Sequence, residues 1–157
     1  MATVWSAGGI IKKGAAWQIS PNPETKDGLI GRLRIGTHKG MCIGTTDLRD
    51  DKWHHIAIVM YGGDKAEVST HILMYIDGVL EKTSKKSIAR INTGVDNKKS
   101  KPLNFGRNLG FDSDNKKLPD KFFKGLLDEV FIFDTALDEE QIRGLMNDNR
   151  LPNKTTL

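Results

Sequence analysis

Hydrophobic and polar positions alternate with a period of two along most of this chain. In residues 29–37, Leu33 and Ile35 alternate with Arg32 and Arg34. Successive strand side chains point to opposite faces, so this pattern predicts a strand with one buried and one wet face. Further β-rich stretches, bounded by glycine-containing turns, predict strands at 8–14, 16–20, 40–44, 52–61, 71–83 and 123–134.

Two local signals predict a hairpin and a helix. Asp77-Gly78 separates two β-rich arms, which is typical of a two-residue type I′ turn. Helical periodicity begins near Asp138, which we expect to cap a short helix, with Gln141 completing a capping box. Leu137 is expected to pack against the first helical turn. The buried stripe predicted for this helix is Ile142, Leu145 and Met146.

Composition agrees with a single folded domain. The chain has 157 residues, 38% hydrophobic and 28% charged, which is ordinary for a globular domain. We expect an all-β, antiparallel jelly-roll β-sandwich with one short C-terminal helix at 1–150, followed by a tail at 151–157. No apolar run is long enough for a membrane helix, and the N-terminus does not resemble a signal peptide. Cys42 is the only cysteine, so cysteine-based zinc sites and intrachain disulfides are excluded, and we expect it to be buried.

Charge is uneven along the chain. The formal net charge is +4, and residues 82–101 contain seven lysines and arginines against Asp96 alone. Such a stretch can bind a polyanionic glycan or a nucleic acid through counterion release. It contains no aromatic residue on which bases could stack, so nucleic acid is the weakest alternative. The simplest interpretation is a solvated loop and strand edge.

Three motifs resemble the laminin G-like domains of the concanavalin A-like lectin/glucanase superfamily. They are "DDKWHHIAIVMY", "ILMYIDGVLEKT" and "FKGLLDEVFIFDTALDEEQI", in the order that the family uses. The resemblance spans roughly residues 9–146 and implies a jelly roll of two curved antiparallel sheets. It also implies that Trp53 is buried, and that the family's first strand is missing from this chain or replaced.

Carboxylate geometry argues against a glycosidase. A retaining enzyme needs two carboxylates about 5 Å apart across one bond. Asp128 and Glu129 are adjacent, so in a regular strand they would point to opposite faces. The adjacent His54 and His55 diverge for the same reason, although we expect one of them to form a hydrogen bond inside the sandwich. We therefore predict that the domain is not an enzyme.

Calcium is the one cofactor that the resemblance implies. Several laminin G-like domains bind one calcium ion at the sandwich edge, and the aspartate of the "DEV" motif, here Asp128, often supplies a ligand. Carboxylate and carbonyl oxygens are what calcium prefers. The alternative for Asp128 is a structural role, in which it caps loop amides or pairs with a basic side chain.

Binding residues are expected on loops carried by the rigid sandwich. Arg107, Asn108 and Phe111 combine polar and aromatic character that suits sugar rings. Our leading hypothesis is a carbohydrate-binding module appended to a larger extracellular or cell-surface protein. The alternative is a protein-binding or structural module of the same fold. We expect a glycan or protein ligand, no membrane insertion and no nucleic-acid partner.

Overall fold

The computed structural model describes residues 2–4, 17–23, 25, 27–37, 40–62, 65–91, 103–108 and 121–151. For residues 2–4, 107, 108 and 121 only the backbone is described. The strands and the helix are β1 (Ala2–Val4), β2 (Trp17–Pro21), β3 (Arg32–Thr37), β4 (Met41–Asp47), β5 (Ile56–Met60), β6 (Ile72–Ile76), β7 (Val79–Leu80), β8 (Thr83–Lys86), β9 (Asn104–Phe105), β10 (Arg107–Asn108), β11 (Lys121–Phe122) and α1 (Glu139–Asp148).

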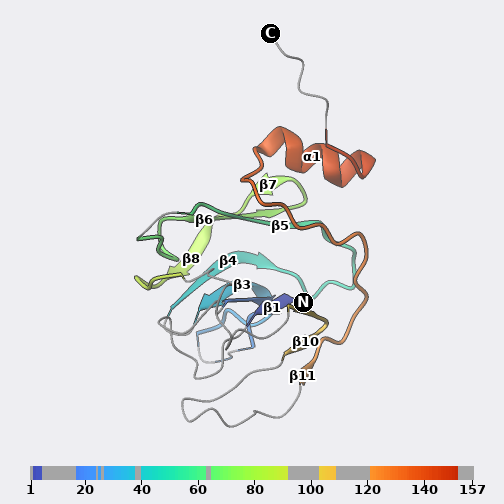
Figure 1. Ribbon diagram of the computed structural model, residues 1–157. Helices are drawn as coiled ribbons and strands as arrows, with labels where there is room; N and C mark the ends of the chain where they lie inside the picture. The colour runs from blue at the N-terminus through green and yellow to red at the C-terminus, as the bar shows by residue number, and fades with distance from the viewer. Residues whose placement is uncertain are drawn as a thin grey trace.

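Two antiparallel sheets form the body of the molecule and confirm the predicted sandwich (Figure 1). One sheet has the strand order β8-β4-β3-β2-β1-β9, and the other has the order β5-β6-β7. Leu33 and Ile35 of β3 pack against Met74 and Ile76 of β6 in the core between them. Cys42 lies in the same core, as predicted, and burial raises the pKa of its thiol. The alternation read along residues 29–37 therefore marks the buried face correctly.

Helix α1 covers the outer face of the three-stranded sheet. Leu137, Ile142 and Leu145 pack against Val59 and Tyr75 on that face, which extends the structure to a third layer. The predicted capping box is confirmed, because the Asp138 carboxylate accepts from the Gln141 amide and the Gln141 side chain accepts from the Asp138 amide. Within the described residues, no helix has the length and apolar character needed to span a membrane.

Met146 does not belong to the buried stripe that we predicted. It is 37% exposed, whereas Ile142 is 1% exposed. A strand face and a short helix meet along a narrow line, so only residues facing the sheet centre are covered. Met146 lies beside the β6–β7 turn instead. Gly78 in this turn has no side chain, and the Met146 Cε lies 3.3 Å from the place where a Cβ of residue 78 would be. The predicted type I′ turn itself is confirmed by positive φ angles at Asp77 and Gly78.

The strand predicted at 123–134 is not formed. In the described part of the chain, residues 124–137 make no backbone-to-backbone hydrogen bond, and β11 ends at Phe122. Glu129 has φ 48°, which interrupts the extended backbone. The connection from β11 to α1 instead runs past the sheets as an unpaired segment (Figure 1). Apolar residues favour a strand, but a strand also needs a neighbour with free donors and acceptors.

Trp53 is also placed differently from our expectation. It precedes β5 and is 64% exposed, although the family resemblance implied a core position. The strand begins only at Ile56, so the loop before it turns this indole away from the core.

The strand expected at 8–14 lies outside the described residues.

Candidate functional site

The loop predicted to bind sugar is only partly described. Arg107 and Asn108 form β10, which pairs with Phe122 and Lys121 of β11. Their side chains, and Phe111 as a whole, lie outside the description. A sugar site at these three residues stays a prediction.

Asp128 lies on the surface and forms a local hydrogen bond. Its Oδ1 accepts from the Glu129 amide at 2.9 Å, so the carboxylate caps a backbone donor. Our argument that Asp128 and Glu129 diverge assumed a regular strand, and that premise is wrong because the φ of Glu129 bends the chain. No group of three His, Cys, Asp or Glu side chains suited to a metal occurs among the described residues. Calcium at Asp128 stays a prediction, because backbone carbonyls can supply further ligands.

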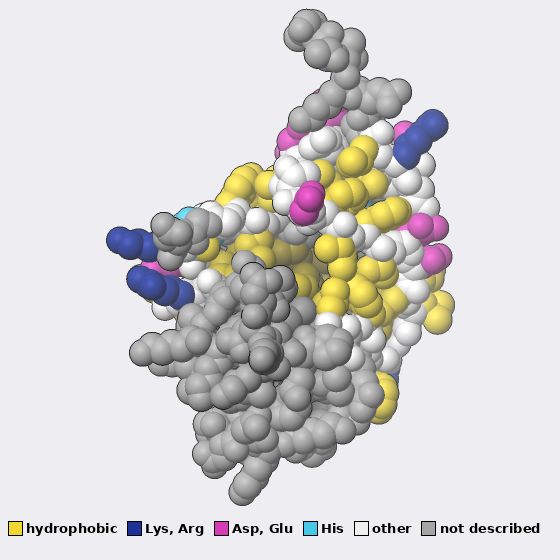
Figure 2. Space-filling view, viewed as in Figure 1, with side chains coloured by type: hydrophobic (Ala, Val, Ile, Leu, Met, Phe, Trp, Pro, Cys, Tyr) yellow, Lys and Arg dark blue, Asp and Glu magenta, His cyan; other side chains and the backbone are white. Residues whose placement is uncertain are grey.

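Six exposed apolar side chains lie within residues 126–133, which we call the apolar segment. Leu126 is 75% exposed, Ile132 67% and Val130 52%. Leu127, Phe131 and Phe133 are also exposed. Hydrophobic side chains gather on this side of the molecule, below α1 (Figure 2). Scattered exposed hydrophobic residues are normal, but a contiguous apolar patch marks an interaction surface.

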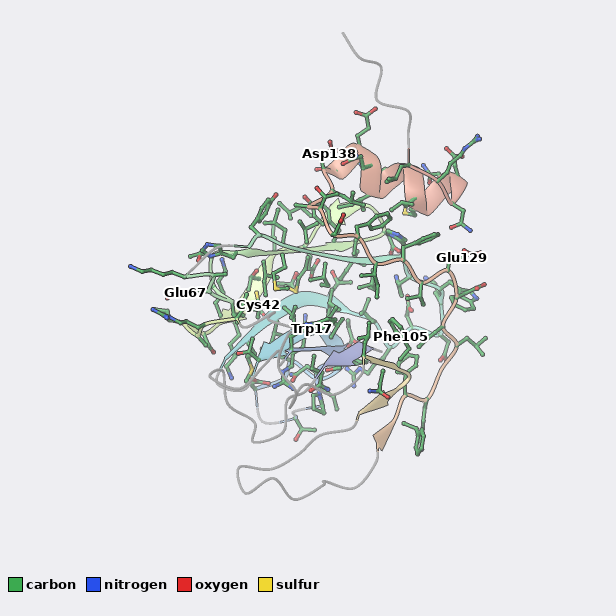
Figure 3. All side chains as sticks on the ribbon, viewed as in Figure 1. Trp17, Cys42, Glu67, Phe105, Glu129 and Asp138 are labelled. Carbon is green, nitrogen blue, oxygen red and sulfur yellow. The ribbon has the colours of Figure 1, made fainter. Side chains whose placement is uncertain are left out.

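Beyond Glu129, two aromatic side chains of the apolar segment contact each other. The rings of Phe131 and Phe133 stack with centroids 6.2 Å apart, as side chains two residues apart on one strand face do. At its start, the segment lies against the β9–β10 turn, where Leu127 Cδ1 is 3.8 Å from the position of a Cβ added to Gly106. Figure 3 shows Phe105 and Glu129 on this same side of the molecule.

The surroundings of the apolar segment are strongly acidic. Residues 128–148 carry seven carboxylates and one basic side chain, Arg143, in a chain whose net charge is +4. Arg143 is already engaged, because it donates to the Gly78 carbonyl and forms an ion pair with Glu139. Residues 128–148 are therefore net negative, while Lys124 precedes the segment, and this balance favours a positively charged partner.

A second surface lies around the exposed Trp53. His54 bridges two carboxylates, with Nδ1 2.8 Å from Asp77 Oδ2 and Nε2 3.0 Å from Asp50 Oδ1. Hydrogen bonding to Asp77 and then to Asp50 raises the pKa of His54. The expected histidine hydrogen bonds thus exist, but they connect surface aspartates rather than groups inside the sandwich. Trp53 precedes this histidine in the chain, and an exposed indole is a surface on which a sugar ring can stack.

The basic stretch that stood out in the sequence is described only up to residue 91. Its strand β8 forms the edge of the six-stranded sheet. Lys85 forms an ion pair with Asp27 at 3.0 Å, and Lys86 donates to the Ser69 carbonyl. This part of the stretch therefore fits the interpretation of a solvated strand edge.

Our sequence reasoning missed the apolar segment as a surface, although one signal was present. Residues 130–133 are four consecutive apolar residues, without the alternation of a half-buried strand. Such a run predicts a strand buried on both faces or a binding surface. Only the missing sheet partner distinguishes these two alternatives.

Comparison with known families agrees with this architecture. The two antiparallel sheets and helix α1 define a β-sandwich domain. Residues 4–143 match the family model of the concanavalin A-like lectin/glucanases superfamily, in its laminin G-like branch, and the chain belongs to this family. Neither the curated proteins nor the solved structures include a significant match. Laminin G-like domains are generally non-catalytic modules that bind carbohydrate or protein.

Proposed function

We propose that this chain is a protein-recognition module that binds an extended polypeptide along the apolar segment. The observation that supports this most is the exposure of residues 126–133 on a backbone that has no sheet partner among the described residues. An incoming strand would supply main-chain hydrogen bonds and cover the apolar side chains at the same time. A sugar would satisfy neither requirement as well, because it offers few apolar faces and no regular row of amides.

The charge of this region indicates which class of polypeptide would bind. The carboxylates around the segment favour a partner whose apolar strand is flanked by lysine or arginine. Such complementarity speeds association and rejects acidic competitors. Laminin G-like domains are typically extracellular, and we propose the same location for this module, as part of a larger extracytoplasmic protein.

A displayed random-peptide library tests this proposal. We expect the folded chain to select peptides with alternating apolar residues and flanking Lys or Arg. The double substitution Val130→Ser/Ile132→Ser should weaken their binding at least about tenfold, because two exposed apolar anchors are lost. Both residues are exposed, so the fold should tolerate the change. Ile88→Ser is the matched control, since Ile88 is 84% exposed and lies outside the segment.

Three outcomes would contradict the proposal. The library could yield no binder, the binders could ignore the double substitution, or they could respond equally to Ile88→Ser. Analytical ultracentrifugation of the chain alone tests whether a second copy of the chain occupies the segment. If the chain dimerises and the double substitution abolishes the dimer, the segment is an interface between copies rather than a site for another protein.

Carbohydrate binding is the second candidate, supported by the exposed Trp53 beside Asp50 and His54. A glycan array would show saturable binding that Trp53→Ala abolishes and Val130→Ser/Ile132→Ser leaves unchanged. If the chain bound no glycan on the array, including sulfated glycans, this result would count against carbohydrate binding. The two functions use different surfaces, so the same two variants separate them.

A further inference from the structure

A cavity lies where the apolar segment meets the last turn of α1. Its volume is about 430 Å³, at the small end of the range for ligand pockets. Its walls come from three places that are distant in sequence: the residue before β5, the apolar segment and the end of α1. The lining residues used below are His55, Glu129, Phe131, Leu145, Met146 and Asp148.

The electrostatics of this cavity favour a cation. Glu129 and Asp148 contribute carboxylates, and the negative end of the helix dipole points here. The last turn of α1 has no basic residue, and Asp148 instead adds negative charge where a helix disfavours it. Burial lowers the pKa of His55, so this side chain is neutral at pH 7 and supplies no opposing charge. Arg150 is exposed and is not part of the lining.

The remaining walls suit an alkyl or planar group. Phe131, Leu145 and Met146 present apolar surface to the cavity. Long basic side chains place their methylene stem against such surface and their charged head among polar groups. A guanidinium can also lie against the face of a phenylalanine ring. The His55 Nδ1 is buried and has no hydrogen-bond partner among the described residues. The orientation of the imidazole ring is therefore not fixed by a hydrogen bond at this atom.

We propose that this cavity receives an arginine side chain of the partner strand, with its guanidinium at Glu129 and Asp148 and its stem against Phe131 and Met146. This inference rests on the proposed function, because Glu129 and Phe131 belong to the segment along which the partner lies. The cavity then sets the register of the partner, since one arginine fits at one position along the strand. Arginine is preferred over lysine because its planar head both stacks and forms paired hydrogen bonds with carboxylates.

Titration of the ¹⁵N-labelled chain with N-acetyl-arginine-N-methylamide at pH 7 tests this assignment. We expect saturable amide shifts concentrated at residues 55, 129–131 and 145–149. The matching citrulline derivative has the same shape without the charge and should produce no saturable shift. Glu129→Gln and Asp148→Asn should each weaken arginine binding about fivefold or more, because each removes a charge-assisted partner.

Glu140→Gln is the matched control, since Glu140 is an exposed carboxylate of α1 outside the cavity. Equal binding of the citrulline derivative would overturn the assignment, as would equal weakening by Glu140→Gln or shifts spread over the whole acidic surface. Asp148→Asn removes an unfavourable charge at the helix end, so a loss of binding in this variant does not reflect unfolding.

The selected peptides separate this inference from the proposed function. If they bind along the segment but tolerate replacement of every arginine by citrulline, the cavity assignment fails and the proposed function stands. If the arginine derivative binds the cavity while no peptide responds to Val130→Ser/Ile132→Ser, the proposed function fails and the cavity remains a cation site.

Discussion

His54 is held between two carboxylates next to the β6–β7 turn. Asp77 also accepts the His55 amide at 2.9 Å, and its own amide donates to the His55 carbonyl. The histidine therefore links the loop before β5 to the hairpin turn. Its hydrogen bonds to Asp77 and Asp50 raise its pKa above the usual value of 6.5.

The raised pKa predicts how stability depends on pH. The contribution of His54 is fully present below its unfolded pKa of 6.5 and is lost as pH rises through the higher folded pKa. Burial lowers the pKa of the neighbouring His55, so its contribution is lost as pH falls below 6.5. We expect the free energy of unfolding, measured in urea, to peak near about pH 6.5 and to fall on both sides.

Two variants separate these effects. His54→Gln should flatten the decline above about pH 6.5 and leave the decline just below this pH unchanged. His55→Gln should do the reverse. A stability profile of His54→Gln that declines on the alkaline side as steeply as the wild type would show that His54 is not the group responsible.

At the scale of elements, Glu81 accepts hydrogen bonds from β4 close to a register shift in its pairing with β8. The β4–β8 register shifts between Ile43 and Gly44, and the Glu81 carboxylate covers the amides freed there. It accepts from the Thr46 amide at 2.7 Å, from the Thr45 amide, and from both threonine hydroxyls. Burial pushes its pKa upward, but these hydrogen bonds outweigh burial and leave the pKa lowered.

Replacing Glu81 should therefore destabilise the six-stranded sheet. We expect Glu81→Gln to cost about 1–3 kcal/mol in urea denaturation at pH 7, because a neutral amide cannot accept all four bonds. The lowered pKa means that the wild-type advantage is lost as pH falls through the folded pKa of Glu81. Glu129→Gln, at an exposed carboxylate, is the control and should change stability by less than about 0.5 kcal/mol. Equal stability of the two variants would contradict this role.

The sequence predicted the local turn and helix cap correctly, but it did not predict which strand-like segments pair in a sheet. The Asp77-Gly78 turn and the Asp138 cap depend on a few adjacent residues, so their conformations could be read directly. Residues 123–134 carry a strand composition, yet beyond Phe123 they pair with no described strand, and composition does not reveal pairing over long separations. For the same reason Met146 was assigned to the buried stripe, although the width of the contact between α1 and the sheet excludes it.

At the scale of the whole molecule, calcium at Asp128 stays a prediction of the family resemblance. A ligand that binds only the folded state raises the melting temperature by mass action. We expect about 1–10 mM calcium, at or above the roughly 0.1–1 mM dissociation constants of extracellular modules, to raise the melting temperature in a thermal melt. Asp128→Asn should abolish the increase. An absent increase, or one of equal size in the variant, would show that Asp128 is not a calcium ligand.

The sequence by itself determined the sandwich, the turn, the capped helix and the family, because alternation and local backbone preferences act over a few residues. The candidate site was decided by tertiary structure alone. Arg107, Asn108 and Phe111 stood out by residue type, whereas the apolar segment and its cavity depend on which strands pair and which do not. His55, Glu129 and Asp148 meet only because the unpaired segment passes the end of α1. Exposure is a property of three-dimensional neighbours, so the residues that look most like core in the sequence form the surface proposed to bind a partner.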